Sequence, residues 1–154
     1  MIIINKEVEM KFVRPVIIML IAILISGCSA FRNNSVESIQ IITDKSANDG
    51  NATRVDVVFV YGDAGAMPKT VGEWFKGEKA RVLNNPENFK VVSLRMPLGL
   101  IQEVELPSKH SSADHVLVYV DFHDGEGQAP MDLTRYSNPV IIVKDDHYKL
   151  SWRR

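Results

Sequence analysis

The residue whose surroundings point most clearly to a chemical reaction is Cys28, the chain's single cysteine. Two small residues, Ser26 and Gly27, precede it and let a peptidase approach the backbone just before the thiol. A secreted chain with one cysteine cannot form an internal disulfide, and a free thiol is unusual in an oxidising compartment. Lipid modification of the thiol resolves both points, so Cys28 is predicted to be lipidated.

The segment before Cys28 predicts export. A short basic head, with Lys11 and Arg14, precedes an apolar core at residues 16–25. A helix that spans a bilayer needs about 20 residues, whereas the apolar region of a signal peptide has roughly 7–15. Residues 1–27 are therefore expected to be a signal peptide, for which Met10 is a more typical start than Met1.

Residues 10–28 resemble the signal and lipobox of bacterial lipoproteins. In those proteins an aspartate after the cysteine often retains the protein at the inner membrane, and here Ser29 occupies that position. The resemblance therefore implies an outer-membrane lipoprotein that faces the periplasm. Several acyl chains on one cysteine hold a protein far more firmly than a single chain does.

Other chemistry has weak support in the sequence. The histidines are scattered, at His110, His115, His123 and His147, without metal-ligand spacing. The nearest approach to a calcium or zinc site is Asp121, His123 and Asp124 with Glu126, where a solvated strand end is the favoured interpretation. A GxSxG motif and a glycine-rich phosphate loop are both missing. We expect no catalytic residue, metal, cofactor or small-molecule substrate.

Composition limits the remaining function classes. Residues 28–154 suit one domain with a real hydrophobic core. Removal of residues 1–27 takes away three basic and two acidic side chains, which leaves a formal charge of −2. That balance argues against nucleic-acid binding and against electrostatic attachment to lipid.

The mature chain reads as short apolar runs divided by turn residues. Residues 28–36 predict a lipidated cysteine and a polar tether, and 37–154 predict the folded domain. β-Branched and aromatic runs between turn signals predict an all-β sandwich of about seven or eight strands. The expected strands are 37–43, 55–61, 89–94, 100–106, 115–122, 140–143 and 148–152.

One short helix is expected at residues 70–79. Thr70 can cap its start, and Glu73 completes a capping box. Val71, Trp74 and Phe75 share one helical face. Docking of this face on the sheet is favoured over the alternative, an exposed binding patch.

Residues 44–54 form a polar connection without a large apolar side chain. Eleven residues is long for a hairpin loop, where about two to five is usual. Long ordered loops on rigid scaffolds often bind partners, whereas others are passive and flexible. Spacing alone leaves both interpretations open.

The order of these features resembles the outer-membrane lipoproteins of type VI secretion systems, the TssJ family. A lipobox, a strand and an Asn/Asp/Gly-rich loop at 46–51 precede the strand VDVVFVY at 55–61. The segment Glu73-Trp74-Phe75, a Pro-Leu-Gly turn at 97–99 and the strand at 118–124 follow. The resemblance covers most of residues 28–152.

This resemblance implies a transthyretin-like β-sandwich with a non-enzymatic role. Such a protein anchors the secretion system's membrane complex to the outer membrane. The family's first loop contacts the periplasmic C-terminal part of the large inner-membrane subunit, TssM. Carried over, the partner-binding residues are Ala47, Asn48, Asp49, Gly50, Asn51, Ala52, Thr53 and Arg54, with Asn48, Asp49, Asn51 and Arg54 as the polar contacts.

Two other function classes remain as alternatives. A pilotin-type lipoprotein, which escorts a secretin to the outer membrane, would show an apolar patch near Trp74 and Phe75. A periplasmic enzyme or ligand-binding lipoprotein would need a polar pocket with convergent titratable groups, which the sequence does not indicate.

Overall fold

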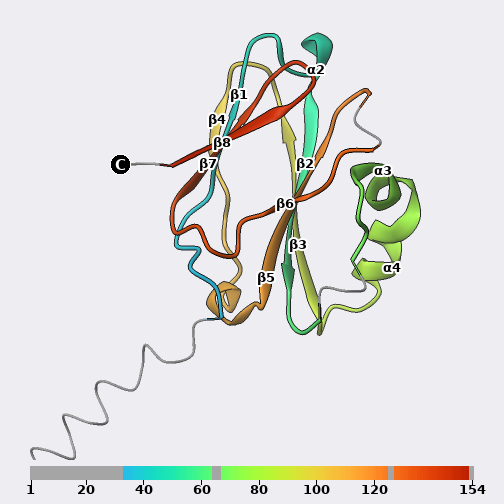
Figure 1. Cartoon of the computed structure of the whole chain (residues 1–154), viewed down its shortest axis with the longest axis vertical. Coiled ribbons are helices and arrows are strands. Elements are labelled where there is room, and N and C mark those ends of the chain that lie inside the picture. Colours follow the sequence, from blue (N-terminus) through green and yellow to red (C-terminus); the bar gives the residue numbers. More distant parts are fainter. Residues whose placement is uncertain (1–32, 64–66, 125–126, 153–154) are drawn as a thin grey trace, which may run out of the picture. The chain divides into compact units, whose positions relative to one another are not determined.

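Two β-sheets pack face to face in the computed structural model, which describes residues 33–63, 67–124 and 127–152 (Figure 1). The first sheet has the order β4-β1-β7-β8 and comprises β4 (Ile101–Glu103), β1 (Gln40–Thr43), β7 (Pro139–Val143) and β8 (Tyr148–Trp152). The second has the order β3-β2-β5-β6 and comprises β3 (Phe89–Met96), β2 (Thr53–Val60), β5 (His115–Asp121) and β6 (Met131–Asp132). Strands β1 and β7 are parallel, and the other pairs are antiparallel. The predicted all-β sandwich is confirmed.

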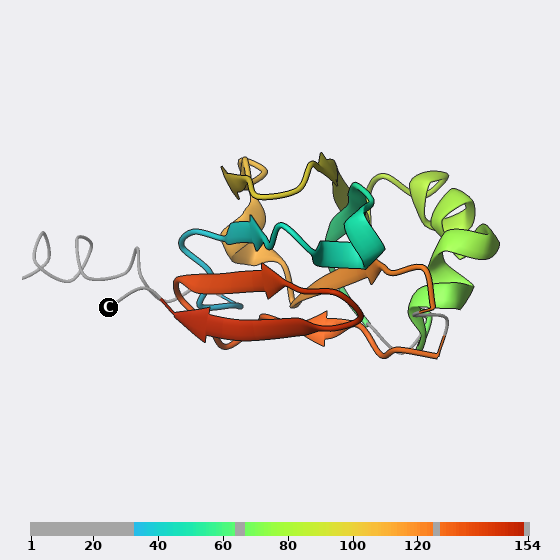
Figure 2. The same ribbon diagram turned by 90° about the horizontal axis from the view of Figure 1, so that it is seen from above.

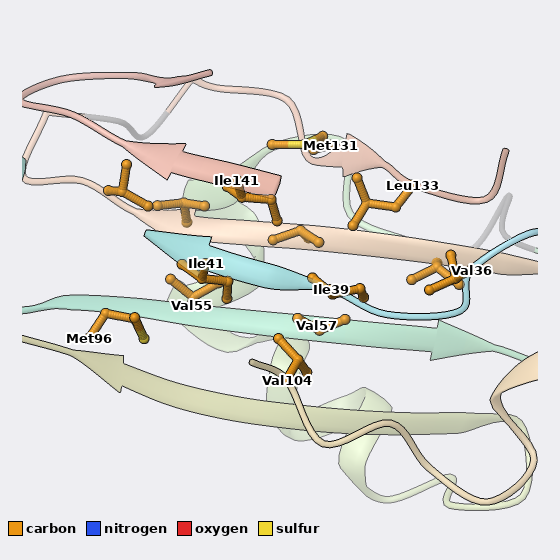
Figure 3. Packing of buried hydrophobic residues seen from close by; sticks show 14 of the residues in the cluster. Val36, Ile39, Ile41, Val55, Val57, Met96, Val104, Met131, Leu133 and Ile141 are labelled. Carbon is orange, nitrogen blue, oxygen red and sulfur yellow. The ribbon is translucent and has the colours of Figure 1, made fainter. Parts of the chain in front are cut away.

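The main core lies between the two sheets (Figure 3). Alternate residues of a strand point to opposite faces, so Val55 and Val57 of β2 face inward. They belong to the same buried cluster as Ile41 and Ile141 of the first sheet. Full burial of each such side chain contributes roughly 1.5–3 kcal/mol.

A helical segment covers the outer face of the second sheet, visible beside β2 and β5 in Figure 1. It comprises α3 (Val71–Glu73), a π-helical turn (Trp74–Glu78) and α4 (Lys79–Leu83). The helix begins where the sequence predicts but ends four residues later, because the chain kinks at Gly77 and then resumes helical geometry.

The N-terminal cap of this segment is close to the predicted capping box. The Thr70 hydroxyl accepts a hydrogen bond from the Glu73 amide at 3.2 Å. The Glu73 carboxylate accepts one from the amide of Lys69 at 3.0 Å, one residue before the expected donor. These bonds satisfy backbone donors that the first turn leaves unpaired.

The aromatic face of the helix docks on the sheet, as predicted. Trp74 is fully buried and stacks on Tyr119 of β5, with ring centroids 4.5 Å apart. The Tyr119 hydroxyl donates to the Pro68 carbonyl at 3.0 Å. Burial, with a smaller contribution from the negative charge of Glu73, raises the pKa of Tyr119 well above its ordinary value. Trp74 is therefore part of a second core and not of an exposed patch.

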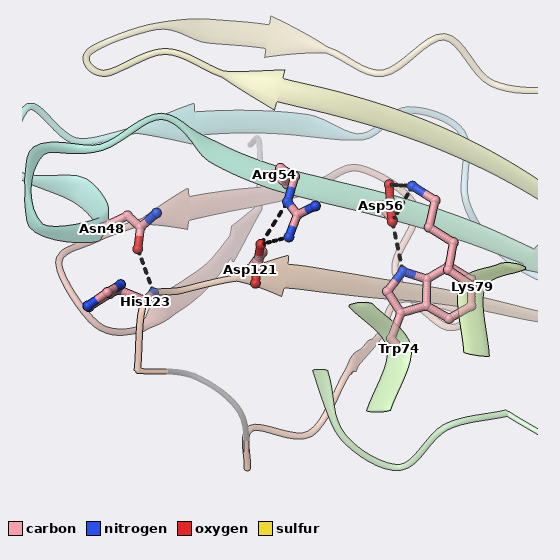
Figure 4. A network of polar contacts seen from close by, with 7 residues as sticks. All are labelled: Asn48, Arg54, Asp56, Trp74, Lys79, Asp121 and His123. Atoms are coloured by element: carbon pink, nitrogen blue, oxygen red, sulfur yellow. Dashed lines mark hydrogen bonds and ion pairs between the residues drawn. The ribbon is translucent and has the colours of Figure 1, made fainter. Parts of the chain in front are cut away.

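A buried carboxylate joins this helix to β2 (Figure 4). Asp56 accepts a hydrogen bond from the indole N–H of Trp74 at 2.7 Å and pairs with Lys79 Nζ at 2.9 Å. Lys79 Nζ also donates to Ser93 on β3 at 2.9 Å. A buried charge is tolerated only when it is paired and hydrogen-bonded, so these contacts explain why Asp56 can occupy an otherwise apolar face.

The first and last residues of several strands differ from those predicted from the sequence. β2 begins at Thr53, so Thr53 and Arg54 belong to the strand and not to the preceding loop. β4 spans only 101–103, because it is an edge strand that pairs with the short β1. The two-residue β6 was not predicted, and neither was a 3₁₀ turn at His110–Ser112. Both lack the long apolar pattern that identifies an element from sequence.

Residues 33–36, assigned to the tether from sequence, pack against the domain. Val36 is fully buried, and the Asn34 side chain donates to the Ala113 carbonyl at 2.8 Å. The Ser35 amide donates to the carbonyl of Thr134 at 2.8 Å. One apolar residue in a polar stretch gave no periodic signal, so the sequence did not reveal this packing.

Replacement of Asp56 by alanine should lower the free energy of unfolding by about 3 kcal/mol, because it leaves the buried Trp74 N–H and the Lys79 ammonium without their acceptor. Asp145→Ala, the same change at an exposed residue, is the matched control and should leave stability nearly unchanged. Urea unfolding of both variants measures this, and equal midpoints would show that the Asp56 network does not stabilise the fold.

Candidate functional site

Four connections meet at one end of the sandwich. Strands β1, β3, β5 and β7 end there, and β2, β4 and β8 begin there. Three of the connections are residues 44–52, 97–100 and 144–147, and residues 122–124 are the described start of the fourth, which leads from β5 to β6. Figure 2 looks onto this end, where α2 (Ala47–Gly50) lies close to the β7–β8 connection. We call this region the turn end.

The β1–β2 connection is an ordered left-handed turn. Asn48, Asp49 and Gly50 have φ values of 50°, 53° and 80°. The left-handed region is costly for most residues, but glycine adopts it freely and asparagine and aspartate tolerate it. The Asn-Asp-Gly sequence therefore suits this left-handed backbone.

Two neighbouring segments hold the turn in place. Ala47 is fully buried in the main core, and the Asn48 amide donates to the Lys144 carbonyl at 3.1 Å. The Asn48 side-chain oxygen accepts a hydrogen bond from the His123 amide at 2.8 Å (Figure 4). Since Asn48 is buried and its side chain is used internally, its predicted role as a polar partner contact does not fit the structure.

The other predicted partner-binding residues differ in their exposure to solvent. Residues 49–52, named here the exposed tip, include Asp49 and Asn51 and are open to solvent. Thr53 is buried in β2, and its hydroxyl has no hydrogen-bond partner within the described residues. Among the eight predicted residues, the tip and the side chain of Arg54 are therefore exposed, whereas Ala47, Asn48 and Thr53 are buried.

Arg54, the second residue of β2, points to the outer face of the second sheet, toward the helical segment. Its guanidinium pairs with Asp121 of β5, with Nε 2.8 Å from the carboxylate oxygen (Figure 4). It also lies 4.8 Å from the ring centroid of Phe75, a cation–π geometry. These residues, with Lys76 and His123, border a shallow hollow of about 200 Å³.

The turn end is acidic. Its described segments carry five aspartates and two lysines, a formal charge of −3 with neutral histidines: Asp44, Lys45, Asp49, Asp124, Lys144, Asp145 and Asp146. Lys144 Nζ lies 3.6 Å from the carboxylate of Asp44. The hydrogen bond from His147 Nδ1, 2.7 Å long, is the main reason that the pKa of Asp146 lies below its ordinary value.

The candidate metal cluster is not assembled in the described part of the chain. Asp121 pairs with Arg54, while Asp124 is exposed; Glu126 lies outside the described residues. Within those residues no group of three or more His, Cys, Asp or Glu side chains lies close enough together to hold a metal ion. Cys28 also lies outside them, and no described helix has the length and apolarity that a membrane span requires.

Comparison with known proteins identifies the fold. No protein-family description and no curated protein sequence matches the chain. Among solved structures, the Serratia marcescens protein Lip, described as a membrane bound component of the type VI secretion system, matches with a TM-score of 0.51 and 12% identity. The match covers 79% of this chain and 99% of that one.

Two further structures give similar values. A chain of the structure described as the C-terminal domain of the type VI secretion protein TssM (869–1107) from EAEC matches with a TM-score of 0.53 and 16% identity, over 75% of this chain and 100% of that one. A chain of a type VI membrane complex gives 0.52 and 14%, over 75% and 96%. At these identities the comparisons establish a shared fold.

Substitution of Asn48 by alanine should destabilise the turn by about 2–4 kcal/mol, because it adds left-handed backbone strain to the loss of a buried hydrogen bond. Asn48→Gly removes only the hydrogen bond and should cost less, while Asn48→Asp keeps an acceptor and should be mildest. Hydrogen exchange at the His123 amide measures the effect directly. Unchanged protection of that amide in Asn48→Ala would contradict the assigned role.

Proposed function

We propose that this chain is a component of a type VI secretion membrane complex, held at the outer membrane by acylated Cys28. In this proposal it faces the periplasm and binds the periplasmic part of a large, TssM-like inner-membrane subunit. The exposed tip, residues 49–52, makes the central contact. The chain acts as a non-enzymatic anchor and carries no cofactor.

One observation carries the proposal: the fold spans nearly the whole of Lip, a membrane bound component of this secretion system. The two further structures reported above are also described as a type VI secretion protein and a type VI membrane complex. The fold alone does not fix a function. It supports this one together with the lipobox at Cys28 and the ordered turn at the position expected for the partner-binding loop.

The position of the tip suits an anchor. The Asn33 amide bonds to the Ser111 carbonyl at 3.0 Å, in the segment that leads into the start of β5. Asn48, immediately before the tip, instead accepts a hydrogen bond from the amide of His123, just after the end of β5. Because the first described residues and the tip lie at opposite ends of this strand, a chain anchored through Cys28 can present the tip to the periplasm.

A rigid turn also lowers the cost of binding. Residues that are already fixed in the bound conformation lose less entropy when a partner docks. Both proteins would be tethered in the same envelope, which raises their effective concentration and allows a modest interface to suffice. The acidic turn end favours a partner with a basic surface, since complementary charge speeds association.

The exposed apolar patch that would favour the pilotin alternative does not form around Trp74. It called for an exposed apolar patch near Trp74 and Phe75, but Trp74 is fully buried against Tyr119. Phe75 is partly buried and lies beneath the guanidinium of Arg54.

Asp49→Lys should weaken binding to the periplasmic domain of the inner-membrane subunit about tenfold or more, which corresponds to about 1.4 kcal/mol. Glu87→Lys changes the charge equally at the opposite end of the second sheet and serves as the matched control. Titration calorimetry with the purified domains, at two salt concentrations, measures both. Equal affinities for the two variants, with unchanged melting temperatures, would exclude the tip as the contact.

Cys28→Ser should remove the protein from the outer-membrane fraction, because the acyl anchor is lost. Envelope fractionation and labelling with a fatty-acid analogue measure this. Continued outer-membrane attachment of the unlabelled variant would refute acylation as the anchor.

A further inference from the structure

We propose that Trp152 and Tyr136 lie in the headgroup region of the bilayer that holds the acyl anchor, and so orient the domain on the membrane. This inference rests on the lipidation of Cys28 in the proposed function. Its ligand is the lipid surface itself. We call the two side chains the aromatic pair.

Both side chains are unusually open to solvent. Trp152 is 65% exposed, the largest value for a large apolar side chain in the described residues, and Tyr136 is 39% exposed. Trp152 ends the edge strand β8 and stands opposite Pro139 in the sheet. Together with Arg135 the pair borders a hollow of about 270 Å³ that extends to Pro139.

The aromatic pair lies beside Glu37 and Ser38, close to the first described residues. The Glu37 amide donates to the Ser137 carbonyl at 2.7 Å, one residue after Tyr136. The Ser38 hydroxyl donates to the Asn138 side chain at 2.7 Å. Ser137 and Asn138 also line the hollow beside Trp152. The pair is therefore close to the segment through which the chain enters the sandwich.

Chain length then places this region near the lipid. Five residues lead from Cys28 to Asn33, and five residues span at most about 18 Å when fully extended. An acylated Cys28 sits at the bilayer surface. Asn33 and the segment that follows it consequently cannot move far from that surface, and exposed side chains beside this segment meet it repeatedly.

The chemistry of the pair suits the interface between lipid and water. Tryptophan and tyrosine combine a large apolar body with a polar tip and concentrate at membrane interfaces. Arg135 can keep its charge in the headgroup layer while its aliphatic stem follows the aromatic rings. Because the mature charge is −2, general electrostatic attraction to lipid is weak, and aromatic insertion supplies the contact that net charge does not.

Contact between the aromatic pair and lipid gives the domain a defined orientation on the membrane. Trp152 pairs with the first residue of β7, whereas the turn packs on Lys144, immediately after the last residue of β7. Contact of the aromatic pair with lipid would thus direct the turn end away from the membrane. The acyl anchor alone does not fix how the domain is oriented.

The two tryptophans provide the test. Trp74 is fully buried and serves as an internal reference, so a change in emission on membrane binding reports Trp152. The lipidated full chain is reconstituted into vesicles of phosphatidylethanolamine and phosphatidylglycerol, with and without lipids brominated near the headgroup. We expect a blue shift and strong quenching by the brominated lipids, both lost in lipidated Trp152→Phe.

A matched probe controls for position. Ile101 is 63% exposed at the start of β4, at the turn end. In a Trp152→Phe background, the brominated lipids should not quench the emission of Ile101→Trp. In the unmutated chain they should quench the emission of Trp152 alone.

The outcomes separate this inference from the proposed function. Failure of the lipidated chain to float with vesicles would overturn the anchor and this inference together. Flotation with solution-like Trp152 emission would overturn the inference alone. A blue shift that grows with protein concentration but is insensitive to brominated lipid would also overturn it, because a second copy would then cover Trp152.

Discussion

The hydrogen bond from the His123 amide to the Asn48 side chain joins the two sheets at the end of the molecule where we place its function. It ties the connection between β1 and β2 to the chain that follows β5. A buried Ala47 and the contact to the Lys144 carbonyl complete the attachment. The backbone immediately before the exposed tip is therefore attached to the sandwich by hydrogen bonds and core packing.

Strand β2 supports this attachment because it is buried on both faces. Val55 and Val57 face the main core, and Asp56 faces the helical segment. Trp74 stacks on Tyr119 over the same outer face. An edge strand or a strand with one wet face would leave the start of β2, and the turn before it, more mobile. The sandwich thus works as a platform whose two layers of packing support a short polar tip.

Sequence predicted the parts of this structure that depend on local pattern. The β-branched runs at β2 and β5 and the capped helix start at Thr70 were identified because propensity and burial agree there. The Asn-Asp-Gly stretch identified the turn. Pairing between distant residues left no such signal, so the internal role of Asn48 was missed, since it depends on His123, which lies 75 residues away in the chain.

Long-range arrangement explains the other differences. The acidic hairpin 144–147 joins the turn only because β1 and β7 are parallel neighbours. The sequence of neither strand indicates which strand it pairs with. Thr53 and Arg54 look like loop residues until β3 and β5 pair with them. Of the predicted binding residues, Thr53 and Arg54 belong to β2 and Ala47 and Asn48 are buried, so residues 49–52 and the side chain of Arg54 are the exposed part of the set.

Site-specific photo-crosslinking in cells tests the central claim most directly. A photoreactive residue at Asn51 in the lipidated chain, compared with one at Glu87 at the opposite end, reports what the tip touches in the envelope. Our account predicts an adduct with the large inner-membrane subunit from position 51 and none from position 87. An adduct with that subunit from position 87 alone would contradict it.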